Sequence, residues 1–164
     1  MDIIDNVLGE VGFNKIIKTV RGHDFPWNLI EYGVSLPGDG SYYFSHEAYD
    51  GITKKTSAYN SLFSNLYIRL GVNILMRSKL NLTFRTKETY VFYPMHTDYA
   101  NNESWSTAIF YLNTNNGYTL FEDGTKVDSV ANRMVIFDGR MKHTGATHTD
   151  DNERFRFLLN INFR

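Results

Sequence analysis

The second half of the chain is a succession of short β-type segments, and this pattern limits the possible folds more than any other feature. Turn-forming stretches such as "NTNNG", "EDGT" and "VANR" separate the segments. From about residue 80 they read LNLTFRT, TYVFYPM, STAIFYLN, GYTLFED, TKVDSV, RMVIFDG and RFRFLLNINF. Many short strands at this spacing favour an antiparallel sandwich or barrel. We therefore predict a mainly β member of the α+β class, built as a jelly roll.

The first half carries helical patterns. Residues 3–20 repeat apolar side chains at i, i+3 and i+4, which predicts one or two amphipathic helices. Residues 24–51 mix aromatic, turn and β-type residues and predict short strands and loops. Residues 57–78 predict a second helical region that is broken near Gly71. We expect the helices to pack on one sheet face of a single domain, with 1–79 as a mixed support region and 80–164 as the jelly-roll core holding the site.

Composition excludes several functions. The 17 basic and 18 acidic residues nearly balance and form no basic run, so we expect no nucleic-acid partner. The absence of cysteine excludes disulfides, thiolate nucleophiles and cysteine-ligated metals, so a metal site must use His, Asp or Glu. The first residues contain no run typical of a signal peptide or membrane span, so we expect a cytoplasmic protein without a membrane partner.

The stretch "YPMHTDYANN" places His96 and Asp98 on one side of an extended chain. Taken alone, such a pair is more often a solvated strand end than a metal site. His143 changes this balance, because "RMVIFDGRMKHTG" predicts a strand, a turn and then a histidine. In a rolled antiparallel sheet the three side chains can meet as the facial triad used by non-haem Fe(II) oxygenases. His148 competes as the third ligand, but it lacks the strand and turn context.

The last segment, "ERFRFLLNINFR", alternates strictly. Its odd positions, from Phe155 to Phe163, are all apolar and predict a buried face. The even face carries Arg154, Arg156, Leu158, Asn160 and Asn162, and it faces either solvent or a polar cavity in which a guanidinium could hold a carboxylate. In "STAIFYLN", Tyr111 and Asn113 share a face. The Tyr111 ring is either a core residue or points into the same interior.

Together these segments resemble the Fe(II)/2-oxoglutarate-dependent dioxygenases, in the prolyl-4-hydroxylase-like branch that includes many small bacterial and phage proteins. The matching stretches occur in the family's order: "HTD", "YLN", "GYTLFEDG", "RMVIFDGRMKHTG" and "RFLLNINF". The resemblance covers residues 80–164, with a weaker match at "DFPWNL". "GYTLF" departs from the family's preferred Gly-Gly turn, and "ATHTDDNE" lengthens the loop before the last strand.

The resemblance implies a double-stranded β-helix in which His96, Asp98 and His143 bind Fe(II). It implies that Arg156 binds the distal carboxylate of 2-oxoglutarate, with Arg154 as the alternative, and that Tyr111 and Asn160 also contact this cosubstrate. Tyr93, Tyr99, Trp105 and Asn162 are the residues expected in the substrate pocket, and Tyr42, Tyr43 and Tyr49 are further aromatic candidates.

The implied activity is hydroxylation of a peptidyl proline or a small metabolite with release of succinate and CO2, with ascorbate as an optional reductant, in a bacterial or phage-infected cell. Two alternatives stay open. One is a cupin-like module that binds a metal or small molecule without oxygenase activity. The other is a structural β-domain in which His96, Asp98 and His143 lie far apart.

Overall fold

The computed structural model describes residues 1–31, 42–87, 94–98 and 104–164. Its helices are α1 (Glu10–Val20), the short 3-10 helix η1 (Asn60–Phe63) and α2 (Ser64–Leu70). Its strands are β1 (Asp2–Ile4), β2 (Asn28–Ile30), β3 (Tyr43–Asp50), β4 (Lys55–Thr56), β5 (Leu75–Phe84), β6 (Ser106–Tyr111), β7 (Tyr118–Phe121), β8 (Lys126–Asp128), β9 (Arg133–Asp138), β10 (His143–Gly145) and β11 (Phe155–Phe163).

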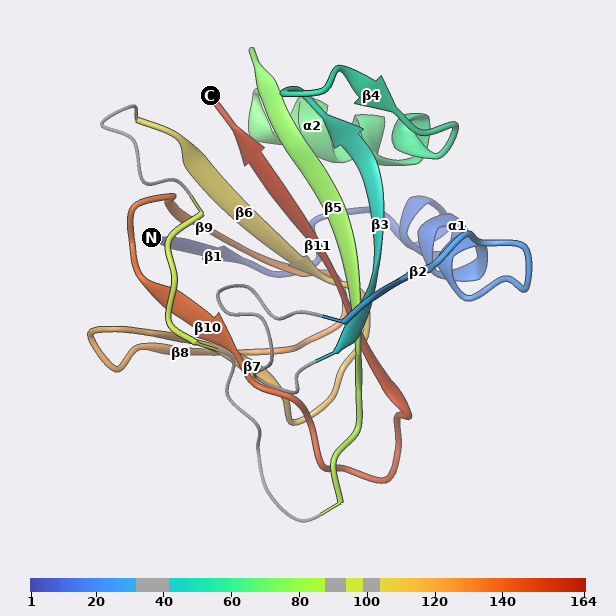
Figure 1. Cartoon of the computed structure of the whole chain (residues 1–164), viewed down its shortest axis with the longest axis vertical. Helices are drawn as coiled ribbons and strands as arrows, with labels where there is room; N and C mark the ends of the chain where they lie inside the picture. Colours follow the sequence, from blue (N-terminus) through green and yellow to red (C-terminus); the bar gives the residue numbers. More distant parts are fainter. Residues whose placement is uncertain (32–41, 88–93, 99–103) are drawn as a thin grey trace.

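The described strands form two antiparallel sheets (Figure 1). In the larger sheet the order is β1-β9-β6-β11-β5-β3-β2, with β4 paired to β3, and in the smaller sheet it is β10-β7-β8. The second half of the chain passes back and forth between the two sheets, from β6 to β7 and β8, back to β9, then to β10 and back to β11, so it rolls up as the predicted jelly roll. The larger sheet therefore has one face toward the smaller sheet and one face toward the helices.

Strand β11 is the centre of the larger sheet, with β5 on one side and β6 on the other. Its predicted alternation is confirmed, because Phe157, Leu159, Ile161 and Phe163 all belong to the main hydrophobic core. Each such side chain stabilises the fold by roughly 1.5–3 kcal/mol when it leaves water. The opposite face of β11 points between the two sheets, and this face carries the polar side chains.

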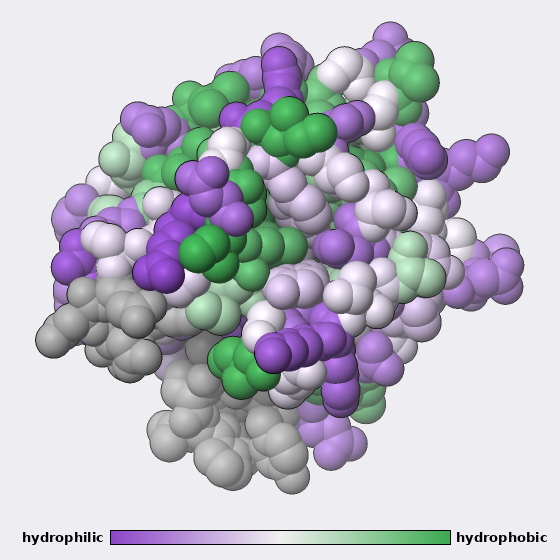
Figure 2. Space-filling view, turned by 90° about the horizontal axis from the view of Figure 1, so that it is seen from above, coloured by the Kyte–Doolittle hydropathy of each residue, from purple (hydrophilic) through white to green (hydrophobic). Residues whose placement is uncertain are grey.

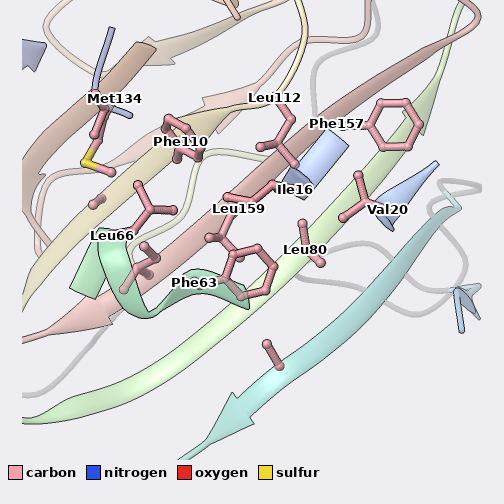
Figure 3. Close-up of a cluster of buried hydrophobic side chains, with 14 of the residues drawn as sticks. Ile16, Val20, Phe63, Leu66, Leu80, Phe110, Leu112, Met134, Phe157 and Leu159 are labelled. Atoms are coloured by element: carbon pink, nitrogen blue, oxygen red, sulfur yellow. The ribbon is translucent and has the colours of Figure 1, made fainter. Parts of the chain in front are cut away.

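The helices cover the outer face of the larger sheet, as predicted (Figures 1 and 3). Ile16 and Val20 of α1 and Leu66 of α2 pack there against Leu80 and Leu159 of the sheet. The helix α2 ends at Gly71, whose φ of 63° is a left-handed conformation that favours glycine. The expected break at this residue is thus the end of the helix.

Three expectations about elements need correction or lie outside the described chain. Residues 2–4 form strand β1 on β9 and not a helix, because two consecutive isoleucines fit a short strand as well as a helical face. Residues 75–78 also belong to a strand, since β5 begins directly after the α2 turn and crosses the expected division at residue 79. The predicted strand 89–95 falls mostly on residues 88–93, outside the described chain.

The surface offers no single dominant apolar area on the face drawn in Figure 2, where hydrophobic side chains lie in separate groups between hydrophilic ones. The most exposed large apolar side chains, Val11, Ile52 and Ile68, come from three different parts of the chain. Scattered apolar residues are normal on a protein surface and need no partner. Neither α1 nor α2 is long and apolar enough to cross a membrane.

Candidate metal centre and cavity

A cavity of about 490 Å³ lies between the two sheets, and its floor is the inner face of β5, β11 and β6. The strand register sets this floor out in rows that run across the strands. One row joins Thr107, Asn162 and Arg77, the next joins Ile109, Asn160 and Lys79, and a later one pairs Arg156 with Thr83. Successive rows are two residues apart, so they lie about 6.6 Å from each other along the strands.

The predicted metal ligands meet at one side of this cavity. One ligand atom from each of His96, Asp98 and His143 lies within 4.8 Å of the others. Backbone pairing brings the two histidines together, because each peptide N–H donates to the carbonyl of the other at 3.0 and 2.9 Å. The alternative in which these three residues lie far apart is therefore wrong.

Both histidine rings are held by their own loops. The Nδ1 of His96 lies 3.1 Å from the carbonyl of Pro94, and the Nδ1 of His143 lies 3.0 Å from the carbonyl of Met141. A carbonyl only accepts, so each Nδ1 carries a proton and each Nε2 is the nitrogen left to bind a metal. Fixing the tautomer in this way is how proteins usually prepare a histidine to bind a metal.

The Asp98 carboxylate is oriented by side chains of the sheet floor. Its Oδ2 accepts hydrogen bonds from Thr107 Oγ1 at 2.8 Å, Asn162 Nδ2 at 3.0 Å and Asn160 Nδ2 at 3.4 Å. Its Oδ1 lies 3.3 Å from a terminal nitrogen of Arg77. These contacts come from three neighbouring strands, so the sheet itself sets the direction of the carboxylate.

The protonation states suit a cation. Burial lowers the pKa of His96, and the neighbouring His143 lowers it further, so the imidazole stays neutral. Burial alone raises the pKa of Asp98, but His143, Arg77 and the hydrogen bonds from Thr107 and Asn162 outweigh it and lower this pKa. Two imidazoles and one carboxylate on one side of a cavity are the donor set of the facial triad, which suits Fe(II) and leaves coordination positions open.

Arg156 occupies the far end of the floor and is only 2% exposed. Its Nε donates to Ser129 Oγ at 2.7 Å, and its guanidinium lies over the Tyr111 ring at 5.6 Å from the centroid. Two glycines leave room for it. A Cβ at Gly117 would lie 2.8 Å from the Arg156 Cδ, and one at Gly145 would lie 3.4 Å from a terminal nitrogen. Gly117, directly before β7, and Gly145, at the end of β10, thus leave space for a buried cation.

The other predicted site residues are distributed as follows. Arg154 is exposed and precedes β11, whereas Arg156 and Asn160 line the cavity. Tyr111 is fully buried behind the described cavity wall and donates to Thr119, which does line it, at 2.8 Å. Asn162 is fully buried, and its Nδ2 donates hydrogen bonds to Asp98 and Thr107.

The expected substrate-pocket residues give a mixed result. Trp105 is buried under Arg164, whose guanidinium lies 4.7 Å from its ring, and it is not part of the described cavity wall. Its place directly before β6, beside Arg164, explains this position. Tyr93 and Tyr99 lie outside the described residues. Of the further tyrosines, Tyr43 lines the cavity.

The competing histidine, His148, is not part of the metal cluster. It is fully buried, and its Nε2 lies 2.9 Å from the carbonyl of Glu153, within the loop before β11. His46 is held between Pro26 and Ser57 on the opposite face of the larger sheet. The expected choice of His143 over His148 thus agrees with the geometry of the described chain.

The cationic cavity residues Arg77 and Lys79 on β5 were not expected from the sequence. Arg77 was assigned to the end of the helical region 57–78 and Lys79 to no helix or strand, although "RSKLNLTF" alternates polar and apolar residues in a way that indicates a strand. The Lys79 ammonium lies 3.4 Å from the Tyr43 hydroxyl and 5.5 Å from the centre of that ring. Burial, then Arg77, lowers the pKa of Lys79 to about 8, although Glu47 and Asp98 oppose this.

Replacing Lys79 with methionine should stabilise the protein at neutral pH. The cost of the buried ammonium is fully present below pH 8, where both folded and unfolded chains are protonated. It shrinks between pH 8 and 10.5, because the folded protein loses this proton first. We expect Lys79→Met to raise the free energy of unfolding by on the order of 1–2 kcal/mol at pH 7 and by less at pH 9.5.

Urea denaturation of both proteins at the two pH values measures this difference. Lys126→Met is the matched control, because Lys126 also lies over a tyrosine ring, at 3.9 Å from its centroid, but is exposed on β8. A stability gain for Lys79→Met that does not change between pH 7 and 9.5 would contradict the conclusion that burial lowers the pKa of Lys79.

Comparison with known proteins places this geometry in a known fold. An oxidoreductase of the 2OG-Fe(II) oxygenase family from Burkholderia pseudomallei matches 98% of this chain and 83% of its own, with a TM-score of 0.68 and 12% identity. A prolyl hydroxylase from Trichoplax adhaerens, in complex with a hypoxia inducible factor oxygen degradation domain peptide fragment, matches 99% and 82%, with a TM-score of 0.64 and 18% identity. A prolyl-4-hydroxylase from Pseudomonas putida matches 99% and 91%, with a TM-score of 0.57 and 18% identity.

No protein-family model and no curated protein matches the sequence. The structural matches establish the fold, because they span nearly the whole chain, while identities of 12% to 18% do not carry activity across. The chain thus has the 2OG-Fe(II) oxygenase fold together with a His-x-Asp and His cluster at one cavity. This confirms the predicted jelly roll and, at the level of fold, the predicted resemblance.

Proposed function

We propose that this chain, with its 2OG-Fe(II) oxygenase fold, is an Fe(II)- and 2-oxoglutarate-dependent oxygenase that hydroxylates a small metabolite or a peptidyl proline. The observation that carries the proposal is the convergence of His96, Asp98 and His143 on a cavity whose far end holds the buried Arg156. A metal and a dicarboxylate have complementary partners in this one space. Bound Fe(II) and 2-oxoglutarate would supply the O2-dependent oxidation, with release of succinate and CO2.

The residues of the chain would bind and orient these groups. The two Nε2 atoms and the Asp98 carboxylate would hold the metal, while Thr107, Asn162 and Arg77 keep that carboxylate in position. Arg156 would bind the distal carboxylate of 2-oxoglutarate through a charge-assisted hydrogen bond in a site that water reaches poorly. The Tyr111 ring would support the Arg156 guanidinium, and the Tyr111 hydroxyl would donate its hydrogen bond to Thr119.

The second candidate is a cupin-like module that binds a metal or small molecule without oxidising it. The same three metal ligands would serve both functions. The buried Arg156 at the end of the cavity favours the oxygenase, because a module that binds only a metal has no need of an anion site beside it. Two structural neighbours are prolyl hydroxylases, one of them bound to a peptide fragment, which is why a peptidyl proline stays among the candidate substrates.

A succinate-release screen tests the proposed activity. The protein is incubated with Fe(II), ascorbate, 2-oxoglutarate and O2 against peptides and free metabolites, and succinate is measured with and without each compound. An oxygenase should release succinate in proportion to a hydroxylated product with its own substrate. Metal binding without 2-oxoglutarate binding or turnover would instead favour the cupin-like module.

A further inference from the structure

The cavity carries more positive charge than the proposed metal and cosubstrate require. Among its described lining residues, Arg77, Lys79 and Arg156 are cationic and Asp98 is the one carboxylate. A bound Fe(II) ion would add two positive charges, and 2-oxoglutarate would bring two negative ones. An excess of positive charge would then stay at Arg77 and Lys79.

These two cations form a site separate from Arg156. They lie at positions i and i+2 on one face of β5, so their side chains point the same way. Arg156 is paired with Thr83, four residues further along β5 than Lys79, which corresponds to about 13 Å of strand. A five-carbon dicarboxylate held by the metal and Arg156 would have one end at Arg156, whereas Arg77, 3.3 Å from Asp98, lies beside the metal at the other end.

The groups around Arg77 and Lys79 neutralise them only in part. Arg77 donates its Nε to Asn162 at 3.0 Å and one terminal nitrogen to Asp98, and its side chain keeps 29% exposure toward the cavity. No carboxylate of the described residues lies within 4.0 Å of the Lys79 ammonium, whose hydrogen bond goes to the neutral Tyr43. Glu47 lies opposite Lys79 in the strand register and is exposed, and its effect on the pKa of Lys79 is smaller than those of burial and Arg77.

Neutral polar atoms continue the floor from this pair toward Arg156. The Oγ1 of Thr83 and the Oδ1 of Asn160 are buried, belong to side chains that are 7% and 8% exposed, and have no hydrogen-bond partner among the described residues. Both residues line the cavity. Buried polar atoms without partners are rare in folded proteins unless a ligand or water completes them.

We infer that Arg77 and Lys79 form an anion-binding subsite that holds a carboxylate or phosphate group of the substrate beside the metal centre. This inference rests on the proposed function only in assigning the anion to the substrate. Holding two like charges in a half-buried position destabilises the protein without a ligand, and such an arrangement is typical of a binding site. As the substrate, such a subsite favours a small acidic metabolite, or a residue with a free terminal carboxylate, over an internal peptidyl proline.

The test uses the metal-free protein, with neither iron nor 2-oxoglutarate present, and two probe anions. Sodium acetate and inorganic phosphate each replace chloride at constant ionic strength, while the side-chain Nε–H signals of Arg77 and Arg156 are followed by 15N NMR. Arg77→Lys and Arg156→Lys assign the two signals. We expect a saturable shift at Arg77 with an affinity of about 1–10 mM, and the stronger of the two probes identifies the group as carboxylate or phosphate.

The variants separate this subsite from other anion sites. Lys79→Met should weaken the probe's binding at Arg77 about tenfold, Lys79→Arg should restore it, and Lys126→Met should leave it within twofold of the wild type. Occupying Arg156 with N-oxalylglycine on the Zn(II)-loaded protein should leave the Arg77 shift in place. A shift confined to Arg156, no saturable shift, or unchanged binding in Lys79→Met would each overturn the inference. Absence of oxygenase activity would not affect these outcomes.

Discussion

Metal affinity should fall roughly 100-fold or more when either histidine of the cluster is replaced in His96→Ala or His143→Ala. Each substitution removes one of three ligand atoms that lie within 4.8 Å of one another, and the two remaining ligands cannot enclose the ion on one side. Under the proposed function, succinate release should be lost together with metal binding. Calorimetric titration of Mn(II) into each purified variant measures the first effect.

The control for these variants is His23→Ala, because His23 is exposed and outside the metal cluster. It should keep the metal affinity of the wild-type protein. The fold of each variant is checked by its thermal unfolding, which we expect to change little because none of the three ligands belongs to the main core. Tight Mn(II) binding that survives both His96→Ala and His143→Ala would show that the cluster is not the metal site.

The second large effect concerns Arg156. Arg156→Met should lower the affinity for N-oxalylglycine, an analogue of 2-oxoglutarate, by roughly 100-fold while leaving Mn(II) binding intact. The reason is that removing the buried Arg156 guanidinium would leave the carboxylate of the bound analogue without its charged partner, which costs several kcal/mol of binding free energy. Arg156→Lys should keep part of the affinity, because it keeps the charge but not the planar pair of donors.

Arg154→Met is the matched control for this experiment. Arg154 lies two residues earlier in the sequence but is exposed and precedes β11, so the substitution should leave N-oxalylglycine binding unchanged. Calorimetry on the Mn(II)-loaded proteins measures all three variants under one condition. If Arg154→Met loses the analogue and Arg156→Met retains it, the cosubstrate position proposed here is wrong.

The parts of the fold with a strict sequence pattern were predictable. The alternation of Phe157, Leu159 and Ile161 with Arg156 and Asn160 defined both faces of β11, because a strand repeats every two residues and both faces are buried. The turn before His143 identified the second histidine for a similar reason. It places the side chain at the start of β10, where pairing with residue 96 brings it to the cluster.

The parts that failed were short or ambiguous. Three residues, 2–4, are too few to distinguish a strand from a helix turn, and only pairing with β9 decides the outcome. Arg77 and Lys79 were missed because the apolar helix α2 runs into β5 with only a few residues between them. Asp98 and its partners Thr107 and Asn162 are separated by up to 64 residues, so this network follows from sheet register alone.

The most direct test of the central claim is a calorimetric titration of N-oxalylglycine into the wild-type protein, with and without Mn(II). The claim is that the triad and Arg156 form one site for a metal and a 2-oxoglutarate-like dicarboxylate. It predicts binding of one analogue per chain that requires Mn(II), since the metal and Arg156 each hold one end. No binding of the analogue to the Mn(II)-loaded protein, or binding of equal strength without the metal, would contradict the claim.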